Sequence, residues 1–256
     1  LQRLTELAKK SKAKKPELGQ WLAKIKEWKA KFNYPFAYRN RAHITAQEAI
    51  SALYHESKGK LTVSTGVGQH QMATPQNYIF TKPRQLLSSL GAGTMGFGLP
   101  AALGAKIAKP QDEVVDIAGD GSFQMNIQEM ATAVAEKIPV KVLLINNQFL
   151  GMVMQWQDLL FNGNYANTIL SLDPKNMGGP ENVAAVYPDY CKIAEGYMWE
   201  AARVYKKEDL HAAIRKMLAS KKPYLLEVIT EHDEHVLPFI PPGKSAEDII
   251  TVRPAK

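Results

Sequence analysis

Residues 113–123 read Glu-Val-Val-Asp-Ile-Ala-Gly-Asp-Gly-Ser-Phe, and the architecture expected of the rest of the chain follows from them. The first six residues form a short, mostly apolar run with β-branched side chains, which is typical of a buried strand. The run leads into Gly119-Asp-Gly121, and a helical pattern follows from Phe123 to Lys137. Asp120 therefore lies where a strand gives way to a helix. Free N–H groups and the positive end of the helix dipole attract anions at such a junction, and the glycines let a ligand approach the backbone.

Strands and helices alternate on both sides of this segment. The pattern predicts further strands at Leu61–Thr65, Val140–Ile145, near Ala201–Tyr205 and at Tyr224–Thr230. A capping box, Thr45-Ala-Gln-Glu48, predicts a helix that extends to about Lys58, and another helix is expected at Leu210–Lys221. We therefore expect the α/β class, with a doubly wound parallel sheet covered by helices on both faces.

The basic character of the chain is confined to its N-terminus. Residues 1–32 hold ten Lys or Arg against three acidic residues, and so account for the net charge of +7 of all 256 residues. Apolar residues at helical spacing from Leu18 to Trp28 favour a linker helix without a nucleic-acid partner, and a nucleic-acid-binding arm is the alternative. We expect a basic helical arm at 1–34, an α/β domain at 35–236 and an extended surface tail at 237–256. Residues 33–41, where the arm meets the domain, are aromatic and expected to be irregular.

The composition also excludes some classes of protein. No apolar run is long enough to cross a bilayer, and no apolar run follows the early Lys residues as it would in a signal peptide. The single cysteine, Cys191, excludes an internal disulfide and is expected to be a small packed side chain. We expect a chain that is neither secreted nor bound to a membrane.

Three loops are expected to meet beyond the carboxyl ends of the strands, where parallel sheets bind ligands. They are Gly66–Gln71, Gly119–Ser122 and Asn146–Gly151, all rich in Gly, Asn, Gln or Asp. Asp120 beside a phosphate would need a bridging cation, for which Mg²⁺ is usual. Asn147 and the turn carbonyl near Phe149 can add two oxygen ligands. Alone, the Gly-Asp-Gly segment would be interpreted as a turn, but the paired arrangement, with Asn147 lying 27 residues after Asp120, favours a site.

Several segments, in the right order, resemble the large catalytic subunit of the acetohydroxyacid synthase (acetolactate synthase) family, in its C-terminal thiamine-diphosphate-binding domain. They are Gly66-Val-Gly-Gln-His-Gln71, Gly91-Ala-Gly-Thr-Met-Gly-Phe-Gly-Leu-Pro-Ala101, Gly119-Asp-Gly121 with Asn146-Asn147, Gly151-Met-Val-Met-Gln-Trp156 and His235-Val-Leu-Pro-Phe-Ile-Pro241. The resemblance extends over roughly residues 35–250. It implies that thiamine diphosphate binds through Mg²⁺, with Asp120, Asn147 and the carbonyl of Phe149 as metal ligands.

The resemblance implies roles for other residues as well. The diphosphate would be held beside Gly119 by Gln69, His70, Gly121 and Ser122, and walled by Leu150, Gly151 and Met152. The carbonyl of Gly93 would meet the aminopyrimidine, and Met95 would keep the cofactor folded. Trp156 would lie at the substrate entrance and help to select the second 2-oxo acid.

The implied reaction is the decarboxylation of pyruvate and its joining to a second pyruvate or to 2-oxobutyrate. The products are 2-acetolactate or 2-aceto-2-hydroxybutyrate, in branched-chain amino acid biosynthesis. The resemblance implies a pyrimidine-binding domain and an FAD-binding domain outside these residues, on the same polypeptide or a partner chain. The isolated chain is therefore expected to bind little cofactor and to be inactive.

The resemblance further implies a homodimer or homotetramer, a regulatory small subunit as a candidate partner, and a bacterial cytoplasm, a plastid or a mitochondrion as the location. Two alternatives stay open: another thiamine-diphosphate enzyme, of the pyruvate oxidase or 2-oxo acid decarboxylase type, and a non-catalytic cofactor-binding module.

Two further patterns have simpler interpretations. Gly91-Ala-Gly-Thr-Met-Gly96 matches a dinucleotide-binding pattern, but Arg84–Leu90 before it does not have the composition of a strand. His232-Asp-Glu-His235 has the side chains of a metal site, yet we interpret it as a solvated loop.

Overall fold

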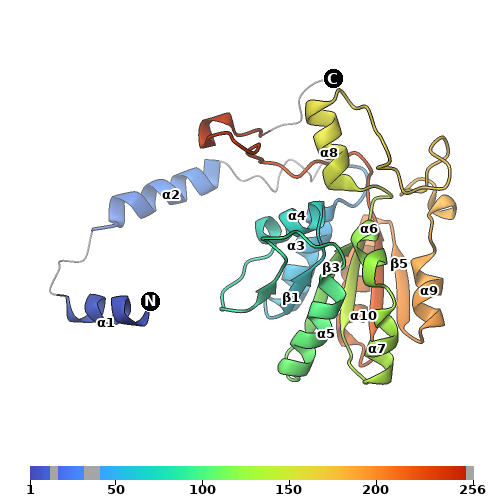
Figure 1. The fold of residues 1–256 in the computed structure, drawn as a ribbon, viewed down its shortest axis with the longest axis horizontal. Coiled ribbons are helices and arrows are strands. Elements are labelled where there is room, and N and C mark those ends of the chain that lie inside the picture. The colour runs from blue at the N-terminus through green and yellow to red at the C-terminus, as the bar shows by residue number, and fades with distance from the viewer. Residues whose placement is uncertain (12–16, 32–40, 252–256) are drawn as a thin grey trace. The chain divides into compact units, whose positions relative to one another are not determined.

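The computed structural model describes residues 1–11, 17–31 and 41–251, and the chain divides into two compact units, Leu1–Phe36 and Ala37–Lys256. The first unit contains helices α1 (Gln2–Lys10) and α2 (Gly19–Lys31) (Figure 1). In α2 the rings of Trp21 and Trp28 pack edge to face with their centroids 5.6 Å apart. The predicted arm helix is confirmed, whereas the irregular stretch expected at 33–41 lies, except for its last residue, outside the described residues.

The second unit is built on a six-stranded parallel sheet with the strand order β2-β1-β3-β4-β6-β5. Its strands are β1 (Thr62–Thr65), β2 (Leu86–Leu87), β3 (Val114–Gly119), β4 (Lys141–Asn146), β5 (Glu200–Val204) and β6 (Tyr224–Ile229). Every neighbouring pair runs parallel. The predicted doubly wound α/β class and its five predicted strands are confirmed. The expectation that Arg84–Leu90 contains no strand was wrong, because two residues of it pair with β1 at the edge of the sheet.

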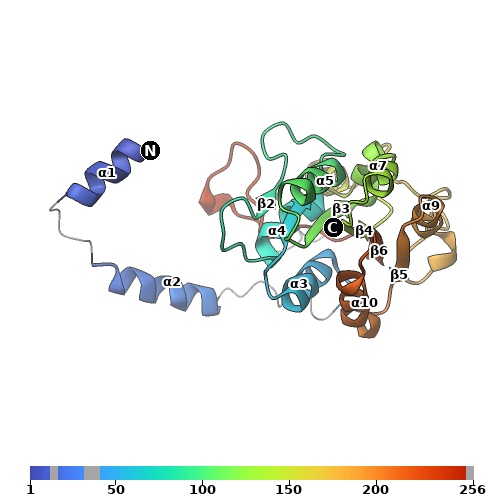
Figure 2. The ribbon, with the colours of Figure 1, turned by 90° about the horizontal axis from the view of Figure 1, so that it is seen from below.

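Helices cover both faces of this sheet (Figures 1 and 2). One face packs against α3 (Ala46–Ser57), α4 (Gln69–Asn77) and α10 (Lys207–Ala219). The other packs against α5 (Gly98–Ala108), α7 (Glu129–Ala135) and α9 (Tyr190–Gly196). Side chains alternate along a strand, so Val115 and Ile117 enter the first core and Val114 and Ala118 the second. The two apolar layers hold the parallel strands between them, so the carboxyl ends of β1, β3 and β4 lie at the same edge of the sheet.

Local signals explain where the helices begin. The predicted capping box is confirmed: the Glu48 N–H donates to Thr45 Oγ1 at 3.1 Å, and the Thr45 N–H donates to Glu48 Oε2 at 3.0 Å. The helix predicted from Phe123 to Lys137 is interrupted, because α6 (Asp120–Phe123), a 3₁₀ turn η2 (Gln124–Asn126) and α7 follow one another. The remaining elements are α8 (Gly151–Leu160) and two 3₁₀ turns, η3 (Val183–Ala185) and η4 (Ala246–Asp248).

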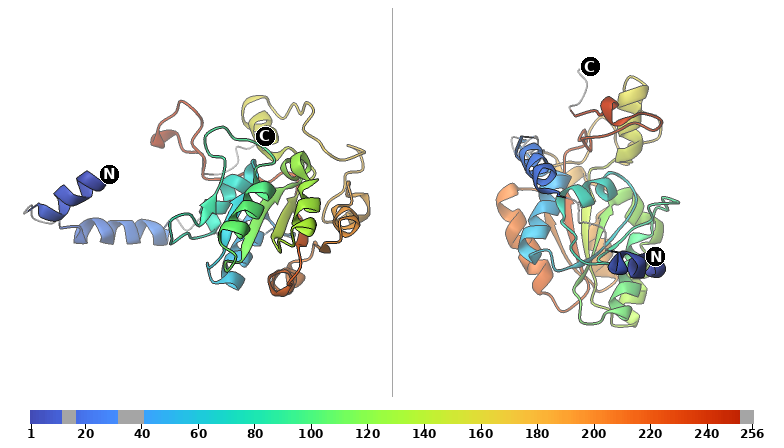
Figure 3. Two further views of the ribbon diagram at one scale, coloured as in Figure 1. Left: turned by 60° about the horizontal axis from the view of Figure 1, so that its bottom comes forward. Right: turned by 90° about the vertical axis from the view of Figure 1, so that its left-hand side faces the viewer.

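The segment after β6 folds back instead of running along the surface. Leu237 and Phe239 are buried, and Phe239 pairs with Ile250 through backbone hydrogen bonds of 2.9 and 2.8 Å. Like α8, this segment lies beyond the carboxyl ends of the strands (Figures 1 and 3). The expectation of an extended surface tail from Leu237 was therefore wrong for its first residues, because their apolar side chains find a surface to pack on. No helix among the described residues is long and apolar enough to span a bilayer.

Candidate functional site

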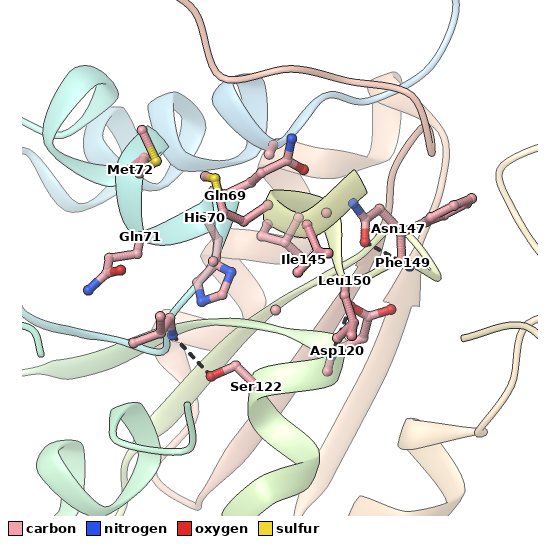
Figure 4. A pocket seen from close by; sticks show the side chains of 18 of the residues that line it. Gln69, His70, Gln71, Met72, Asp120, Ser122, Ile145, Asn147, Phe149 and Leu150 are labelled. Atoms are coloured by element: carbon pink, nitrogen blue, oxygen red, sulfur yellow. Dashed lines mark hydrogen bonds between the residues drawn. The ribbon is translucent and has the colours of Figure 1, made fainter. Parts of the chain in front are cut away.

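The three loops singled out in the sequence meet at one cavity of about 290 Å³ beyond the carboxyl ends of β1, β3 and β4 (Figure 4). The cavity is lined by every residue that the resemblance assigned to the cofactor: Gln69, His70, Gly93, Met95, Gly119, Asp120, Gly121, Ser122, Asn147, Phe149, Leu150, Gly151 and Met152. The sheet brings these residues together from positions up to 83 residues apart, because parallel strands end at the same edge.

Asp120 is tied into this cavity by backbone donors. Its Oδ1 accepts the Gly121 N–H at 3.0 Å, and its Oδ2 accepts the Gln148 N–H at 2.9 Å. Burial raises the pKa of Asp120 to about 7, against the opposing effect of these hydrogen bonds. Each carboxylate oxygen keeps a lone pair with which it can accept a cation. A cation bound there would offset the cost of burying the negative charge of Asp120.

The turn after β4 presents oxygen atoms beside Asp120 (Figure 4). Asn147 Oδ1 accepts the Phe149 N–H at 3.1 Å, and Gln148 adopts a left-handed φ of 59°. The described residues contain no group of three His, Cys, Asp or Glu side chains able to hold a metal. A metal at this site would therefore need amide and carbonyl oxygens as well as the Asp120 carboxylate, a donor set that suits a hard cation such as Mg²⁺.

Glycines leave room for His70 between two of the loops. A Cβ on Gly119 would lie 2.5 Å from Nδ1 of His70, and one on Gly66 would lie 2.8 Å from Nε2. Burial lowers the pKa of His70 to about 4, so the ring is neutral at pH 7. Its Nε2 is buried beside the Gly66 backbone.

Ser122 and Gln69 connect the loops to one another. Ser122 Oγ accepts the Val67 N–H at 3.0 Å and the Gly96 N–H at 3.1 Å. Gln69 Nε2 donates to Gln155 Oε1 at 3.0 Å and to the Glu234 carbonyl at 2.7 Å. These bonds hold the loops after β1 and β3 and the segment after β6 in one wall.

The two residues implied in catalysis lie differently. Met95 lines the cavity, and its Cε lies 3.7 Å from the point where a Cβ on Gly121 would be. Trp156 does not line the cavity; its ring packs edge to face on Phe239, with centroids 5.3 Å apart. Trp156 belongs to α8, and its side chain therefore packs this helix against the segment after β6.

The interpretation of His232–His235 as a solvated loop was wrong for Glu234 and His235, whereas Asp233 is exposed. His235 Nε2 and Asp158 Oδ2 lie 2.7 Å apart and both side chains are buried, while Glu234 lines the cavity with its side chain buried. Burial raises the pKa of Glu234 to about 8. The sequence shows only four polar residues here. The burial of Glu234 and His235 cannot be predicted from them, because it depends on α8 and the capping region of α3, which pack over these two side chains. The Ala46 N–H, for example, donates to Glu234 Oε2 at 3.0 Å.

Cys191 packs as predicted. Its side chain is partly buried, and burial raises the pKa of the thiol to about 12. A thiol with that pKa is not a nucleophile at neutral pH.

Comparisons with known proteins agree with this geometry. The profile of the family described as "Thiamine pyrophosphate enzyme, C-terminal TPP binding domain" matches residues 66–228. Acetolactate synthase 2, chloroplastic, of Zea mays is 48% identical over 251 residues, which cover 98% of this chain and 38% of that protein. Acetolactate synthase 3, chloroplastic, of Brassica napus is 50% identical over 237 residues, which cover 93% and 35%.

A solved structure shares the fold. The thiamine diphosphate-dependent 4-hydroxybenzoylformate decarboxylase of Rhodococcus jostii RHA1 superposes with a TM-score of 0.64 at 25% sequence identity, over 76% of this chain and 34% of that chain. The chain thus spans little more than a third of the length of the curated relatives that it matches.

Proposed function

The chain belongs to the thiamine pyrophosphate enzyme family, as its C-terminal cofactor-binding domain, and from this premise we propose that it supplies the diphosphate-binding half of an acetolactate synthase site. The observation that carries the proposal is the cavity of about 290 Å³, which is lined by the buried Asp120, the buried His70 and Asn147. Identity of 48% to the maize acetolactate synthase over 98% of this chain supports the choice of reaction.

The residues present fit Mg²⁺ and a diphosphate. Asp120, Asn147 and the carbonyl of Phe149 would hold the metal, whose charge would offset that of the diphosphate. The hydroxyl of Ser122, the side chains of Gln69 and His70 and the backbone at Gly121 would contact the diphosphate. Support comes from the lone pairs left on Asp120 and from the space at Gly121, where a Cβ would lie 2.7 Å from Leu150 Cδ2.

The other cavity residues would shape the organic part of the cofactor. Gly93, with a φ of 65°, has a backbone conformation that favours glycine, and it would turn its carbonyl toward the aminopyrimidine. Met95 would pack beneath the thiazolium ring, and Leu150, Gly151 and Met152 would form the wall beside the diphosphate. When bound, thiamine diphosphate supplies the carbon that takes up pyruvate and lets CO₂ leave. The apolar wall would exclude water from that carbon.

We propose pyruvate as the first substrate and pyruvate or 2-oxobutyrate as the second, with Trp156 at the entrance to the site. The pyrimidine-binding and FAD-binding domains would come from outside these residues, in a homodimer or homotetramer to which a regulatory small subunit could bind. The likeness to enzymes named as chloroplastic supports a plastid among the expected locations.

The test joins the chain to the part of the maize relative that lies outside the matched residues and supplies pyruvate, thiamine diphosphate and Mg²⁺. We expect 2-acetolactate, and its loss when Mg²⁺ is chelated. Release of acetaldehyde without acetolactate would identify a decarboxylase instead, the alternative that the Rhodococcus structure represents. The absence of both products would contradict the proposed function.

A further inference from the structure

A buried carboxylate lies behind the turn that presents the candidate metal ligands. Glu227 is the only charged residue in β6, and its side chain is completely buried. Its Oε2 accepts Arg203 Nε at 2.6 Å, and its Oε1 accepts Asn146 Nδ2 at 2.7 Å. Arg203, on the neighbouring strand β5, also donates to Asp189 at 2.9 Å. Glu227 therefore joins an ion pair on one side to the last residue of β4 on the other.

Asn146 continues the connection toward the cavity. Its Oδ1 accepts two bonds from Gln148, from the backbone N–H at 3.1 Å and from Nε2 at 2.8 Å. The same Gln148 N–H donates to Asp120 Oδ2 at 2.9 Å. A backbone N–H can only donate, so Asn146 must turn its oxygen toward Gln148 and its NH₂ toward Glu227. Glu227, an acceptor at that point, is the partner that this orientation requires.

We propose that Glu227 is a positioning residue for the metal-binding turn. It fixes the amide of Asn146, which holds the left-handed Gln148 and thereby sets the positions of Asn147 and the Phe149 carbonyl relative to Asp120. The inference rests on the proposed function, since it takes these three residues as the metal ligands. Partners behind metal ligands typically change metal affinity 10- to 100-fold when they are removed.

Glu227→Gln tests this orientation, because it keeps the shape of the side chain and replaces an acceptor with a donor. When the oxygen of the new glutamine side chain at position 227 accepts from Arg203, its NH₂ group faces the NH₂ group of Asn146. Asn146 can accept from that NH₂ only if its amide turns over, and its own NH₂ then faces the Gln148 N–H. Adding Asn146→Asp restores every bond, because a carboxylate at position 146 accepts from the new amide at position 227 on one side and from Gln148 on the other. A role limited to the Arg203 ion pair would not be rescued by that second change.

The first measurement is amide hydrogen exchange of residues 146–150 in the cofactor-free chain, which does not depend on any activity. Glu227→Gln is expected to speed exchange at Gln148 by roughly tenfold or more, and the double variant to restore it to within about threefold. Asp189→Asn serves as the control, since it removes the charge of the outer partner of Arg203 and leaves the Glu227–Asn146 bond. Should Glu227→Gln unfold the chain, Asn146→Ser, which removes the acceptor for Gln148, is expected to speed the same exchange.

The second measurement is the Mg²⁺ concentration needed for half-maximal thiamine diphosphate binding in the chain joined to its partner domains. We expect that concentration to rise roughly 10- to 100-fold in Glu227→Gln and to recover in the double variant. Unchanged exchange in Glu227→Gln and in Asn146→Ser, or a defect that the double variant does not rescue, would overturn the proposal. If the unsubstituted assembly binds no cofactor, the proposed function fails, and the exchange comparison still decides whether Glu227 positions the turn.

Discussion

The backbone N–H of Gln148 donates to Oδ2 of Asp120 over 2.9 Å, and this bond joins the end of β3 to the turn after β4. The two residues lie 28 positions apart in the sequence and meet because β3 and β4 are parallel neighbours. The bond sets the carboxylate beside the oxygens of the turn, so the candidate cation site depends on the same strand pairing as the sheet.

Asp120→Asn tests the part that the carboxylate takes in metal binding. We expect Mg²⁺-dependent thiamine diphosphate binding to weaken by roughly 100-fold or more, because the carboxylate beside the turn oxygens is lost. The pKa of Asp120 is raised to about 7, so its contribution to stability is present below the unfolded value of 3.8 and is lost as the pH rises through about 7. In the cofactor-free variant the amide has one oxygen, so either the Gly121 N–H or the Gln148 N–H faces an NH₂ group, and this loss opposes the gain from removing the buried charge at pH 8. Equal affinity for Mg²⁺ in the two proteins would remove Asp120 from the site.

Gly151→Ala should close the gap between two cavity residues. A Cβ there would lie 2.8 Å from Asn147 Nδ2 and would collide with Gln69 Oε1. We expect weaker cofactor binding and a loss of about 1–3 kcal/mol of unfolding free energy, measured by urea denaturation. Gly104→Ala is the matched control: it lies inside α5 with open space around it and should add about 1 kcal/mol. Similar behaviour of the two variants would show that the space at Gly151 is not needed.

Glu234→Gln should flatten the dependence of stability on pH. Burial raises the pKa of Glu234 from 4.5 to about 8, so its contribution is fully present below pH 4.5 and is lost as the pH rises through about 8. The glutamine oxygen can still accept the Ala46 N–H, which now bonds Oε2 at 3.0 Å. Thermal melts at pH 5 and pH 8 should differ less in the variant than in the parent, by an amount on the order of 1–4 kcal/mol in unfolding free energy. An unchanged difference between the two pH values would show that Glu234 titrates normally.

His235→Ala should release the start of the segment after β6. The pair of His235 and Asp158, 2.7 Å apart, is buried on both sides, and leaving Asp158 short of a partner costs about 1–3 kcal/mol. Hydrogen exchange of residues 236–239 should rise together with this loss. Tyr165→Phe is the comparison, since it removes the 2.6 Å bond from the Tyr165 hydroxyl to Asp158 and leaves His235 in place. If both variants speed exchange at 236–239 equally, His235 does not anchor the segment.

The sheet and the cavity could be predicted because their signals are local. Apolar β-branched runs mark the strands, and the Gly, Asp and Asn residues that follow them mark the loops at the carboxyl edge. The two-residue strand Leu86–Leu87 was missed, since its pairing depends on β1 beside it and not on its own composition. The burial of Glu234 and His235 was missed for the same reason: polar residues become part of a wall only when distant elements cover them.

The sequence of β6 carries a signal of the network behind the turn. Tyr224-Leu-Leu-Glu-Val-Ile229 carries a single carboxylate inside an otherwise apolar strand. A buried charge is costly unless it is paired, so such a residue indicates a partner and a network. The sequence does not say that the partner is Arg203 or that the network reaches Gln148, because both depend on the order of the strands.

The most direct test of the account replaces Mg²⁺ with Mn²⁺ and locates the ion by its anomalous scattering in crystals grown with thiamine diphosphate, using the chain joined to its partner domains. We predict one peak about 2.1–2.3 Å from Asp120, the Asn147 side-chain oxygen and the Phe149 carbonyl, with diphosphate oxygens completing its ligands. A peak elsewhere, or a bound cofactor with no ion between its diphosphate and Asp120, would contradict the account.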